Sequence, residues 1–248
     1  MSFSGKTVLI TGGASGMGLL SGKCFAKEGA NVVLVDFDKE GLNAAVDEVK
    51  EITQNVIGCC TDVRDYNQVK KSCEDAVESF GTIDILISCA GGSEVRIMGA
   101  KGDFSELPIE VVDFGIDVNL KGAMYYDHAV LPYMKKQRSG VIIHLGSITG
   151  YEGSKSNIAY SASKSALMNG VVKSIALLGA DYGIRACTVA PGPVMTRPGM
   201  AKMKTLMGYQ AEPQELVDMF MFLASDKARS ITGTTIMVDG GRSVMYNK

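Results

Sequence analysis

Short apolar runs rich in β-branched residues alternate with longer helical segments, and this alternation is what most constrains the fold. Seven such runs are expected to form strands, at residues 6–11, 31–36, 56–61, 83–88, 141–145, 184–190 and 235–238. The second run, NVVLVD, is apolar almost throughout, as expected for a parallel strand covered on both faces. The alternation predicts an α/β fold with a doubly wound, mainly seven-stranded parallel sheet and helices on both faces.

Helical spacing or capping signals separate the strands. Helices are expected at residues 16–28, 39–53, 65–80, from 108 to about 134, 158–181 and from 213 to about 224. Residues 91–107 and 191–212 are rich in glycine or irregular and are expected to be loops. No linker, repeat or low-complexity segment divides the chain, so residues 1–248 are expected to form a single domain.

The composition excludes several function classes. The chain is 46% hydrophobic and 21% charged with a net charge of -2, which is typical of a soluble globular protein and does not suggest a nucleic-acid partner. It has no run of about 18 apolar residues and no apolar leader, so we expect a cytoplasmic, unanchored protein. Six cysteines without Cys-x-x-Cys spacing are expected to be reduced, and no spacing suggests a metal site. His144 is expected to be a satisfied core histidine, and His128 a packed or exposed helix residue.

A glycine-rich turn follows the first expected strand. It reads Thr11-Gly12-Gly13-Ala14-Ser15-Gly16-Met17-Gly18 and leads directly into a helix. Glycines let the backbone approach a pyrophosphate, and a helix N-terminus offers free N–H groups and a positive dipole end. The spacing is G-x-x-x-G-x-G rather than G-x-G-x-x-G. The strand–turn–helix context nevertheless favours dinucleotide binding over a turn without ligand.

Two aspartates end the next two strands. Asp36 can accept hydrogen bonds from both ribose hydroxyls of NAD and would repel the 2′-phosphate of NADP. No Arg or Lys lies in residues 12–18, or immediately after Asp36, to bind that phosphate. Asp62-Val63 is positioned to hold the adenine edge. The alternatives are a helix cap, which we prefer for Asp38 but not for Asp36, and a turn aspartate at Asp62.

A Tyr-x-x-x-Lys pattern occurs three times, at Tyr66/Lys70, Tyr151/Lys155 and Tyr160/Lys164. On a helix this spacing puts both side chains on one face, about 6 Å apart along the axis. A neighbouring ammonium favours the phenolate and lowers the tyrosine pKa from about 10, which makes a tunable acid/base. Only the third pair opens a long helical segment after a serine at a strand end, Ser147. We therefore expect Ser147, Tyr160 and Lys164 to form one catalytic unit.

In this order, the motifs closely resemble the short-chain dehydrogenase/reductase family over nearly the whole chain. The matching pieces are residues 11–18, Asp62, residues 88–91 (SCAG), Asn119, Ser147, Tyr160-x-x-x-Lys164, Pro191-Gly192 and residues 238–241 (VDGG). The family usually has two asparagines where Ser88 and Cys89 stand, and its asparagine helps brace the central sheet. Because serine and cysteine can do this only in part, we expect the difference to affect local stability more than activity.

The resemblance implies a Rossmann-type fold and assigns catalytic roles. Tyr160 would exchange a proton with the substrate oxygen, and Ser147 would hydrogen-bond that oxygen. Lys164 would bind the nicotinamide ribose, and Asn119 would hold a water that links Lys164 to solvent. The residues expected to bind NAD are Gly12, Ser15, Gly16, Met17, Gly18, Asp36, Phe37, Asp62, Val63, Cys89, Ala90, Gly91, Tyr160, Lys164, Pro191, Gly192, Val194 and Thr196.

The substrate is expected to lie under a flap at about residues 193–212, where the family has its substrate-binding segment. Residues 92–107 are expected to form the opposite wall. The expected lining residues are Ser147, Tyr151, Gly153, Tyr160, Met195 and Met200, the methionines offering soft apolar surface. Arg96 or Arg197 is available to meet an anionic group, although a solvated arginine is the simpler interpretation.

The leading hypothesis is an oxidoreductase that transfers hydride between NAD(H) and a secondary alcohol or its ketone. One alternative is a 3-oxoacyl thioester (acyl-carrier-protein) reductase, an activity that usually goes with NADPH. An alternative of another class is a non-catalytic dinucleotide-binding protein. The resemblance also suggests a homotetramer formed through helices around residues 110–134 and 158–181, and a dimer is compatible with the sequence.

Overall fold

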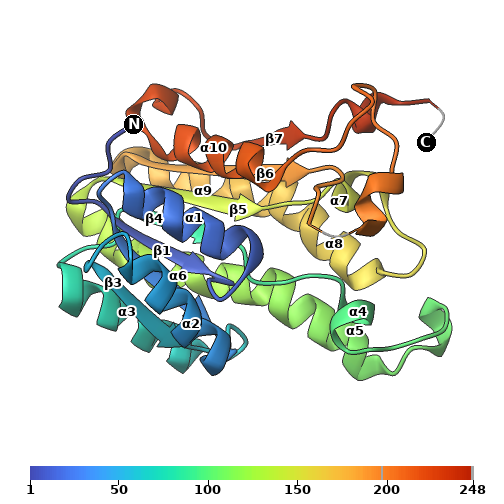
Figure 1. Cartoon of the computed structure of the whole chain (residues 1–248), viewed down its shortest axis with the longest axis horizontal. Helices are drawn as coiled ribbons and strands as arrows, with labels where there is room; N and C mark the ends of the chain where they lie inside the picture. Colours follow the sequence, from blue (N-terminus) through green and yellow to red (C-terminus); the bar gives the residue numbers. More distant parts are fainter. Residues whose placement is uncertain (197, 247–248) are drawn as a thin grey trace.

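A single parallel sheet organises the molecule (Figure 1). The computed structural model describes residues 1–196 and 198–246. The strands are β1 (Thr7–Thr11), β2 (Asn31–Asp36), β3 (Val56–Cys60), β4 (Ile85–Ser88), β5 (Gly140–Leu145), β6 (Ile184–Pro191) and β7 (Thr234–Val238). Their order is β3-β2-β1-β4-β5-β6-β7, with every neighbouring pair parallel. The predicted doubly wound, seven-stranded sheet is confirmed.

Helices cover both faces of the sheet. They are α1 (Gly16–Lys27), α2 (Lys39–Lys50), α3 (Tyr66–Phe80), α4 (Glu94–Ile97), α5 (Ile109–Ile116), α6 (Gly122–Gln137), α7 (Thr149–Glu152), α8 (Ile158–Ala166), α9 (Val172–Gly179) and α10 (Pro213–Ala224). One core layer packs α1, α2 and α10 against the sheet. The other packs α3, α6 and α9 against the opposite face. Because both faces are covered, the strands β1, β2, β4, β5 and β6 are buried over most of their length, while the edge strands β3 and β7 are partly exposed.

The two long predicted helices each contain a π turn. The first runs through α5, η2 (Asp117–Lys121) and α6, and the second through α8, η3 (Leu167–Val171) and α9. A π turn inserts a residue into the helix and is frequent at functional sites. Apolar periodicity predicts that these segments are helical but does not reveal the extra residue. Both π turns lie within or next to the segments that carry Asn119 and Lys164.

The segment expected to be a loop at 91–107 contains two short helical turns. They are α4 and η1 (Phe104–Glu106). The Ser93 hydroxyl accepts a hydrogen bond from the Arg96 N–H at 3.2 Å, and Asp103 forms a capping box with Glu106. Turns this short are fixed by local side-chain caps, so they leave no helical period in the sequence. The four-residue helix α7 was not predicted either; it has no side-chain cap and is too short to show a helical period.

The helix cap expected at Asp38 is confirmed. Asp38 caps α2 by accepting a hydrogen bond from the Gly41 N–H at 3.1 Å. The six cysteines are free thiols. No helix within residues 1–196 and 198–246 is long and apolar enough to cross a membrane.

Candidate active site

The site begins where the strand order reverses, between β1 and β4. Gly12 follows β1 with φ +68°, and a Cβ there would lie 3.0 Å from the Ala90 backbone nitrogen after β4. A Cβ at Gly18 would overlap the Gly12 carbonyl oxygen. Both glycines are therefore required for the close approach of the two strand ends and of α1. Ligands of doubly wound sheets bind in the crevice that forms at this point.

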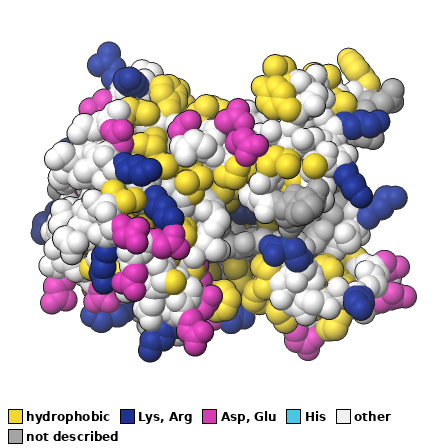
Figure 2. Space-filling model, viewed as in Figure 1, with side chains coloured by type: hydrophobic (Ala, Val, Ile, Leu, Met, Phe, Trp, Pro, Cys, Tyr) yellow, Lys and Arg dark blue, Asp and Glu magenta, His cyan; other side chains and the backbone are white. Residues whose placement is uncertain are grey.

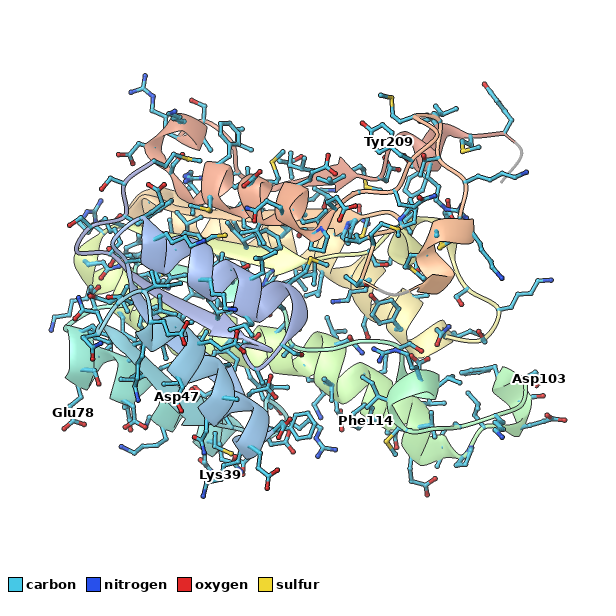
Figure 3. The ribbon with its side chains drawn as sticks, in the orientation of Figure 1. Lys39, Asp47, Glu78, Asp103, Phe114 and Tyr209 are labelled. Atoms are coloured by element: carbon cyan, nitrogen blue, oxygen red, sulfur yellow. The ribbon has the colours of Figure 1, made fainter. Side chains whose placement is uncertain are left out.

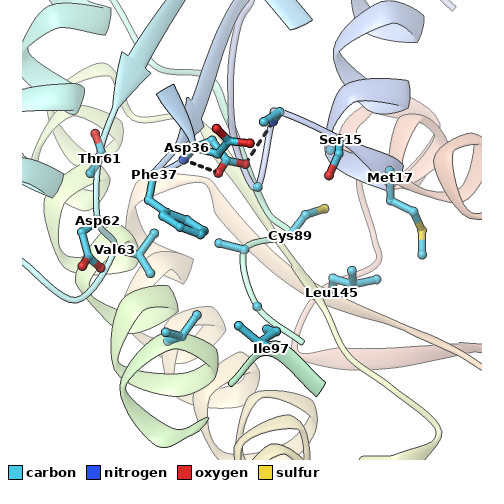
Figure 4. Close-up of a pocket in the computed structure, with 18 of the residues that line it drawn as sticks. Ser15, Met17, Asp36, Phe37, Thr61, Asp62, Val63, Cys89, Ile97 and Leu145 are labelled. Atoms are coloured by element: carbon cyan, nitrogen blue, oxygen red, sulfur yellow. Dashed lines mark hydrogen bonds between the residues drawn. The ribbon is translucent and has the colours of Figure 1, made fainter. Parts of the chain in front are cut away.

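A cavity of about 440 Å³ opens at this crevice (Figure 4). Thirteen of the residues predicted to bind NAD line it: Gly12, Ser15, Gly16, Met17, Gly18, Asp36, Phe37, Asp62, Val63, Cys89, Ala90, Gly91 and Thr196. The structure therefore brings together residues from the ends of β1 to β4 and from the flap. The lining also includes residues that had not been singled out as ligands: Ala14, Asp38, Thr61, Arg64, Ile97, Phe114, Val118 and Leu145.

Five of the residues predicted to bind NAD lie outside the lining of this cavity: Tyr160, Lys164, Pro191, Gly192 and Val194. The Pro191 carbonyl accepts a hydrogen bond from the Ile148 N–H at 2.7 Å, next to Ser147. Gly192 packs against Asp239, so closely that a Cβ would lie 2.7 Å from the Asp239 Cα. Val194 is buried and forms a bridge with Ala211. Pro191 therefore contacts the segment that holds Ser147, and Val194 contacts the other end of the predicted flap.

Asp36 lies at the end of β2 and faces the cavity. Its Oδ2 accepts a hydrogen bond from the Ala14 N–H at 3.0 Å, and its Oδ1 accepts one from the Asp38 N–H at 3.1 Å (Figure 4). These two bonds orient the carboxylate and leave lone pairs for other donors, since each carboxylate oxygen can accept two hydrogen bonds. Phe37, the next residue, is 74% exposed at the cavity.

Arg64 lines the cavity but was not expected there from the sequence. Of the lining residues that were not predicted, it has the clearest electrostatic effect. Its Nη2 lies 2.6 Å from the Asp62 Oδ2, and its guanidinium lies 5.3 Å from the centroid of the Phe114 ring. The hydrogen bond from Arg64 lowers the pKa of Asp62. In the sequence, an arginine four residues after the end of β3 resembles any surface arginine. Only the bidentate pairing shows that it shapes this wall of the cavity.

Lys164 is buried next to Tyr160. Its Nζ lies 5.5 Å from the centroid of the Tyr160 ring and donates a 2.6 Å hydrogen bond to the Leu145 carbonyl. The lysine is 2% exposed, and burial lowers its pKa to about 8. The pair therefore shares one helix face, as the i, i+4 spacing predicts. The bond to the Leu145 carbonyl also places the ammonium at the end of β5, and Leu145 itself lines the cavity.

The other two Tyr-x-x-x-Lys pairs do not combine these features. The Tyr66 hydroxyl lies 2.5 Å from the His128 Nδ1, while Lys70 is exposed and pairs with Glu74. Tyr151 is 63% exposed on α7, and Lys155 lies beyond the end of that helix.

Ser147 is buried where the chain leaves β5. Its Oγ accepts a hydrogen bond from the Thr149 N–H at 3.1 Å. The Thr149 carbonyl in turn accepts a 2.9 Å hydrogen bond from the Ser161 hydroxyl, beside Tyr160. The flanking N–H groups of Gly146 and Ile148 donate to β6 carbonyls at 2.7 Å each. This short chain of contacts ties the serine to the helix that carries the tyrosine.

Asn119 lies in the π turn η2 and is 1% exposed. Its Oδ1 accepts a hydrogen bond from the Gly92 N–H at 2.8 Å, and its Nδ2 donates to the carbonyls of Gly92 and Gly115 at 3.0 and 2.9 Å. The side chain thus holds the segment after β4 against α5. Both amide hydrogens of Asn119 are donated to backbone carbonyls, and its oxygen accepts one N–H and keeps a second lone pair.

This chain has Ser88 and Cys89 where the family usually has two asparagines, and another residue, Thr11, contacts the backbone at this point. The Thr11 hydroxyl oxygen accepts hydrogen bonds from the N–H groups of Cys89 and Ala90 at 3.1 and 3.0 Å. It therefore braces β1 against the end of β4. Cys89 lines the cavity, and desolvation raises its pKa to about 12, so the thiol stays protonated.

The predicted substrate flap is closed at its base. The Met195 N–H donates to the Ala211 carbonyl at 2.9 Å, and the Ala211 N–H donates to the Pro193 carbonyl at 3.1 Å. Arg242 connects the flap to α7, because it donates to the Lys204 carbonyl at 3.0 Å and pairs with Glu152 at 3.1 Å.

The predicted substrate-lining residues surround the end of the sheet. Tyr151 and Gly153 lie on and after α7, and Met195 and Met200 lie on the flap, with Met195 39% exposed. Tyr209 on the flap and Phe114 on α5 lie on opposite sides of the site (Figure 3). Hydrophobic side chains border a hollow between these regions (Figure 2). Arg96 is exposed, and Arg197 lies outside the described residues.

The residues present fit a nicotinamide dinucleotide. Gly16 opens α1, and a Cβ placed there would meet nothing within 4 Å, so the turn leaves open space beside free N–H groups. Asp36 ends β2, the strand next to β1, and its carboxylate keeps lone pairs that can accept further hydrogen bonds. The described part of the chain holds no group of three His, Cys, Asp or Glu side chains placed to bind a metal.

Known proteins match this chain over almost its whole length. The family model for short chain dehydrogenases matches residues 6–206. The 3-oxoacyl-[acyl-carrier-protein] reductase FabG of Thermotoga maritima is 35% identical, covering 97% of this chain and 99% of the relative. The 3beta-hydroxysteroid dehydrogenase 2 of Eggerthella lenta is 34% identical, covering 97% of this chain and 95% of the relative. A crystal structure of gox2181 superposes with a TM-score of 0.89 at 30% identity, covering 98% of both chains. The chain therefore belongs to the short-chain dehydrogenase/reductase family of oxidoreductases.

Proposed function

We propose that this protein is an NAD(H)-dependent dehydrogenase that interconverts a secondary alcohol and its ketone. The observation that carries the proposal is the buried Lys164 ammonium, placed between the Tyr160 ring and the Leu145 carbonyl at the edge of the dinucleotide cavity. A buried cation beside a phenol favours the phenolate. The arrangement therefore supports proton exchange at a substrate oxygen.

The proposed division of labour follows the positions of the side chains. When bound, NAD supplies the hydride acceptor. Tyr160 removes the alcohol proton through its phenolate oxygen and returns it in the reverse direction. Ser147 donates a hydrogen bond to the same substrate oxygen and stabilises the charge that develops there. Lys164 holds the nicotinamide ribose and the phenolate, and Asn119 keeps the strand-end segment in place for a water-linked path to solvent.

We assign NAD rather than NADP to this site because of Asp36. Its carboxylate is fixed at the end of β2 by two backbone N–H groups, where it would accept bonds from ribose hydroxyls and repel a 2′-phosphate. Arg64 is the cation in the cavity lining that could offset this, but its guanidinium is held by Asp62. Steady-state kinetics with NAD and NADP on one accepted alcohol test the assignment. Equal or better use of NADP would refute it.

A second candidate is the reduction of a 3-oxoacyl thioester, which is supported by the 35% identical relative named for that activity. The same Ser147, Tyr160 and Lys164 would serve a ketone of that class. Reduction of an acetoacetyl thioester faster than oxidation of any simple secondary alcohol would favour this candidate. Failure to reduce it would dismiss it.

We further propose a cytoplasmic homotetramer. Large apolar side chains are exposed on the helices expected to form interfaces: Ile109, Met124, Ile158, Leu177 and Leu178. Leu177, at 80% exposure on α9, is the strongest sign of a covered surface. Sedimentation velocity of the purified protein distinguishes a tetramer from a dimer.

A further inference from the structure

A row of polar side chains crosses the sheet just before its carboxyl edge. Thr11, Ser88, His144, Thr188 and Thr235 are successive in-register partners on β1, β4, β5, β6 and β7. Residues paired in register on parallel strands point to the same face, so the five side chains form one line. The first four are buried, with exposures of 0–5%.

The row connects the sheet to the two helices that contain π turns. The Thr188 hydroxyl donates to the Leu167 carbonyl at 3.3 Å, and the Thr235 hydroxyl donates to the Met168 carbonyl at 2.6 Å. Both carbonyls belong to the π turn that follows Lys164. The hydroxyls thus satisfy polar backbone groups where the regular helical bonding is interrupted.

His144 makes the corresponding connection to α6. Its Nε2 lies 2.9 Å from Oδ1 and 3.1 Å from Oδ2 of Asp127, and the two residues are 0% and 2% exposed. The His144 Nδ1 is also buried and has no hydrogen-bond partner among the described residues. The expectation of a core histidine is therefore confirmed, but only one of its ring nitrogens is satisfied. An unpaired buried lone pair costs less than an unpaired N–H of a charged ring, so we assign the proton to Nε2.

Stability alone gives no reason for an ionisable pair at this place. Apolar side chains of similar shape in place of both partners of a buried hydrogen bond often leave a protein about equally stable. The position of the pair is more informative. His144 directly precedes Leu145, whose carbonyl accepts the Lys164 hydrogen bond at 2.6 Å. Asp127 lies eight residues after Asn119 on the same continuous helix.

We propose that Asp127 and His144 form a positioning pair for the active site. Their hydrogen bond fixes the end of β5 to the helix that carries Asn119, and so sets the Leu145 carbonyl that holds the Lys164 ammonium. The pair does not touch the reacting atoms and acts through Leu145 and Lys164. The inference rests on the proposed function only in giving Lys164 a role in turnover.

The double variant Asp127→Leu/His144→Leu provides the main test. It removes both polar groups together, so no buried donor or charge is left unpaired, and we expect an unchanged or higher melting temperature. We expect kcat for alcohol oxidation to fall by about tenfold to about a hundredfold, because a small displacement of a catalytic group has effects of this size. Because Leu145 lines the cavity and Lys164 is proposed to hold the nicotinamide ribose, the KM for NAD should rise in the same variant.

Two single variants separate positioning from general packing. Asp127→Asn keeps an amide oxygen that can accept the Nε2 hydrogen bond, and it should retain most of the wild-type kcat. Tyr126→Phe is the matched control, because it removes the adjacent buried bond from α6, in this case a 2.8 Å contact with the Ser72 hydroxyl on α3. It should lower the melting temperature and leave kcat unchanged.

The outcomes are distinct. A double variant with the wild-type kcat, or Asp127→Asn as slow as the double variant, would overturn the proposal. A crystal structure of the double variant gives a readout that does not depend on turnover: the contact between the Lys164 Nζ and the Leu145 carbonyl should be lost or lengthened, and an unchanged contact would refute the positioning role. Absence of NAD-linked activity in the wild-type enzyme would instead count against the proposed function, and the crystal structure would still decide the role of the pair.

Discussion

The Lys164 ammonium donates a 2.6 Å hydrogen bond to the carbonyl of Leu145, a residue on another element that lines the dinucleotide cavity. This contact explains how a cation can be buried at the end of the sheet without a carboxylate partner. It also fixes Lys164 relative to the strand that leads to Ser147. This hydrogen bond thus connects the helix that carries Lys164 to the strand end that leads to Ser147.

Replacement of Lys164 by methionine should stabilise the protein and abolish its activity. Burial lowers the Lys164 pKa to about 8, below its value in the unfolded chain. At neutral pH the folded protein therefore contains a charged Lys164 whose burial is unfavourable. At pH 7, Lys164→Met should raise the free energy of unfolding by at most about 3 kcal/mol. The contribution of the lost hydrogen bond to the Leu145 carbonyl has to be subtracted from this value. Denaturant unfolding measures it.

The pH dependence of this stabilisation has a definite sign. Between pH 8 and about 10.4 the unfolded chain binds the Lys164 proton more strongly than the folded chain does, so wild-type stability gains from rising pH. The advantage of Lys164→Met should therefore shrink across this window. Lys155→Met, at an exposed lysine of an unused Tyr-x-x-x-Lys pair, is the control and should show no such trend. An advantage for Lys164→Met that grows with pH would contradict the account.

Asp36→Asn should relax the preference for NAD. The amide oxygen can accept from only one of the Ala14 and Asp38 N–H groups, and the substitution removes the charge that opposes a 2′-phosphate. We expect the ratio of kcat/KM for NAD over NADP to fall by about tenfold or more, the equivalent of ~1.4 kcal/mol. Asp38→Asn is the matched control, because asparagine caps a helix as well as aspartate does. A preference that moves equally in both variants would show that Asp36 has no special role.

Gly18→Ala should prevent dinucleotide binding. The added Cβ would overlap the Gly12 carbonyl oxygen, so either the turn or the start of α1 must move. Fluorescence titration with NADH should show a loss of binding, and thermal unfolding a lower melting temperature. Gly170→Ala provides the comparison, because a Cβ there meets nothing within 4 Å and alanine favours a helix. Normal NADH affinity in Gly18→Ala would refute the placement of the pyrophosphate.

The sheet could be predicted almost completely from the sequence. Continuous β-branched runs mark strands buried on both faces. The structure keeps eight of the fourteen predicted strand ends and moves the other six by one or two residues; the largest shift is at β4, which begins at Ile85 rather than at residue 83. The glycine turn and Asp36 were predictable because a motif fixes their positions relative to β1 and β2. The helix pair Tyr160/Lys164 followed from spacing together with a serine at a strand end.

Most parts of the site that the sequence does not predict depend on contacts between distant segments. The Leu145 carbonyl that holds Lys164 cannot be read from local pattern. The same is true of Asp127, which looks like a surface aspartate on a helix until the register of β5 places His144 against it. The pairing of Arg64 with Asp62 is local, but it depends on side-chain geometry that a sequence pattern does not fix. The helices α4 and α7 are only four residues long, so they leave no apolar period in the sequence.

The most direct test of the proposed chemistry is NADH formation by Tyr160→Phe on an alcohol that the wild-type enzyme oxidises. Removal of the proton-exchanging hydroxyl should lower kcat by a factor of about 10² to 10⁴ while NADH still binds. Tyr66→Phe, at the tyrosine of an unused Tyr-x-x-x-Lys pair, should keep most of its activity. Near wild-type turnover by Tyr160→Phe, with NADH bound normally, would contradict the central claim.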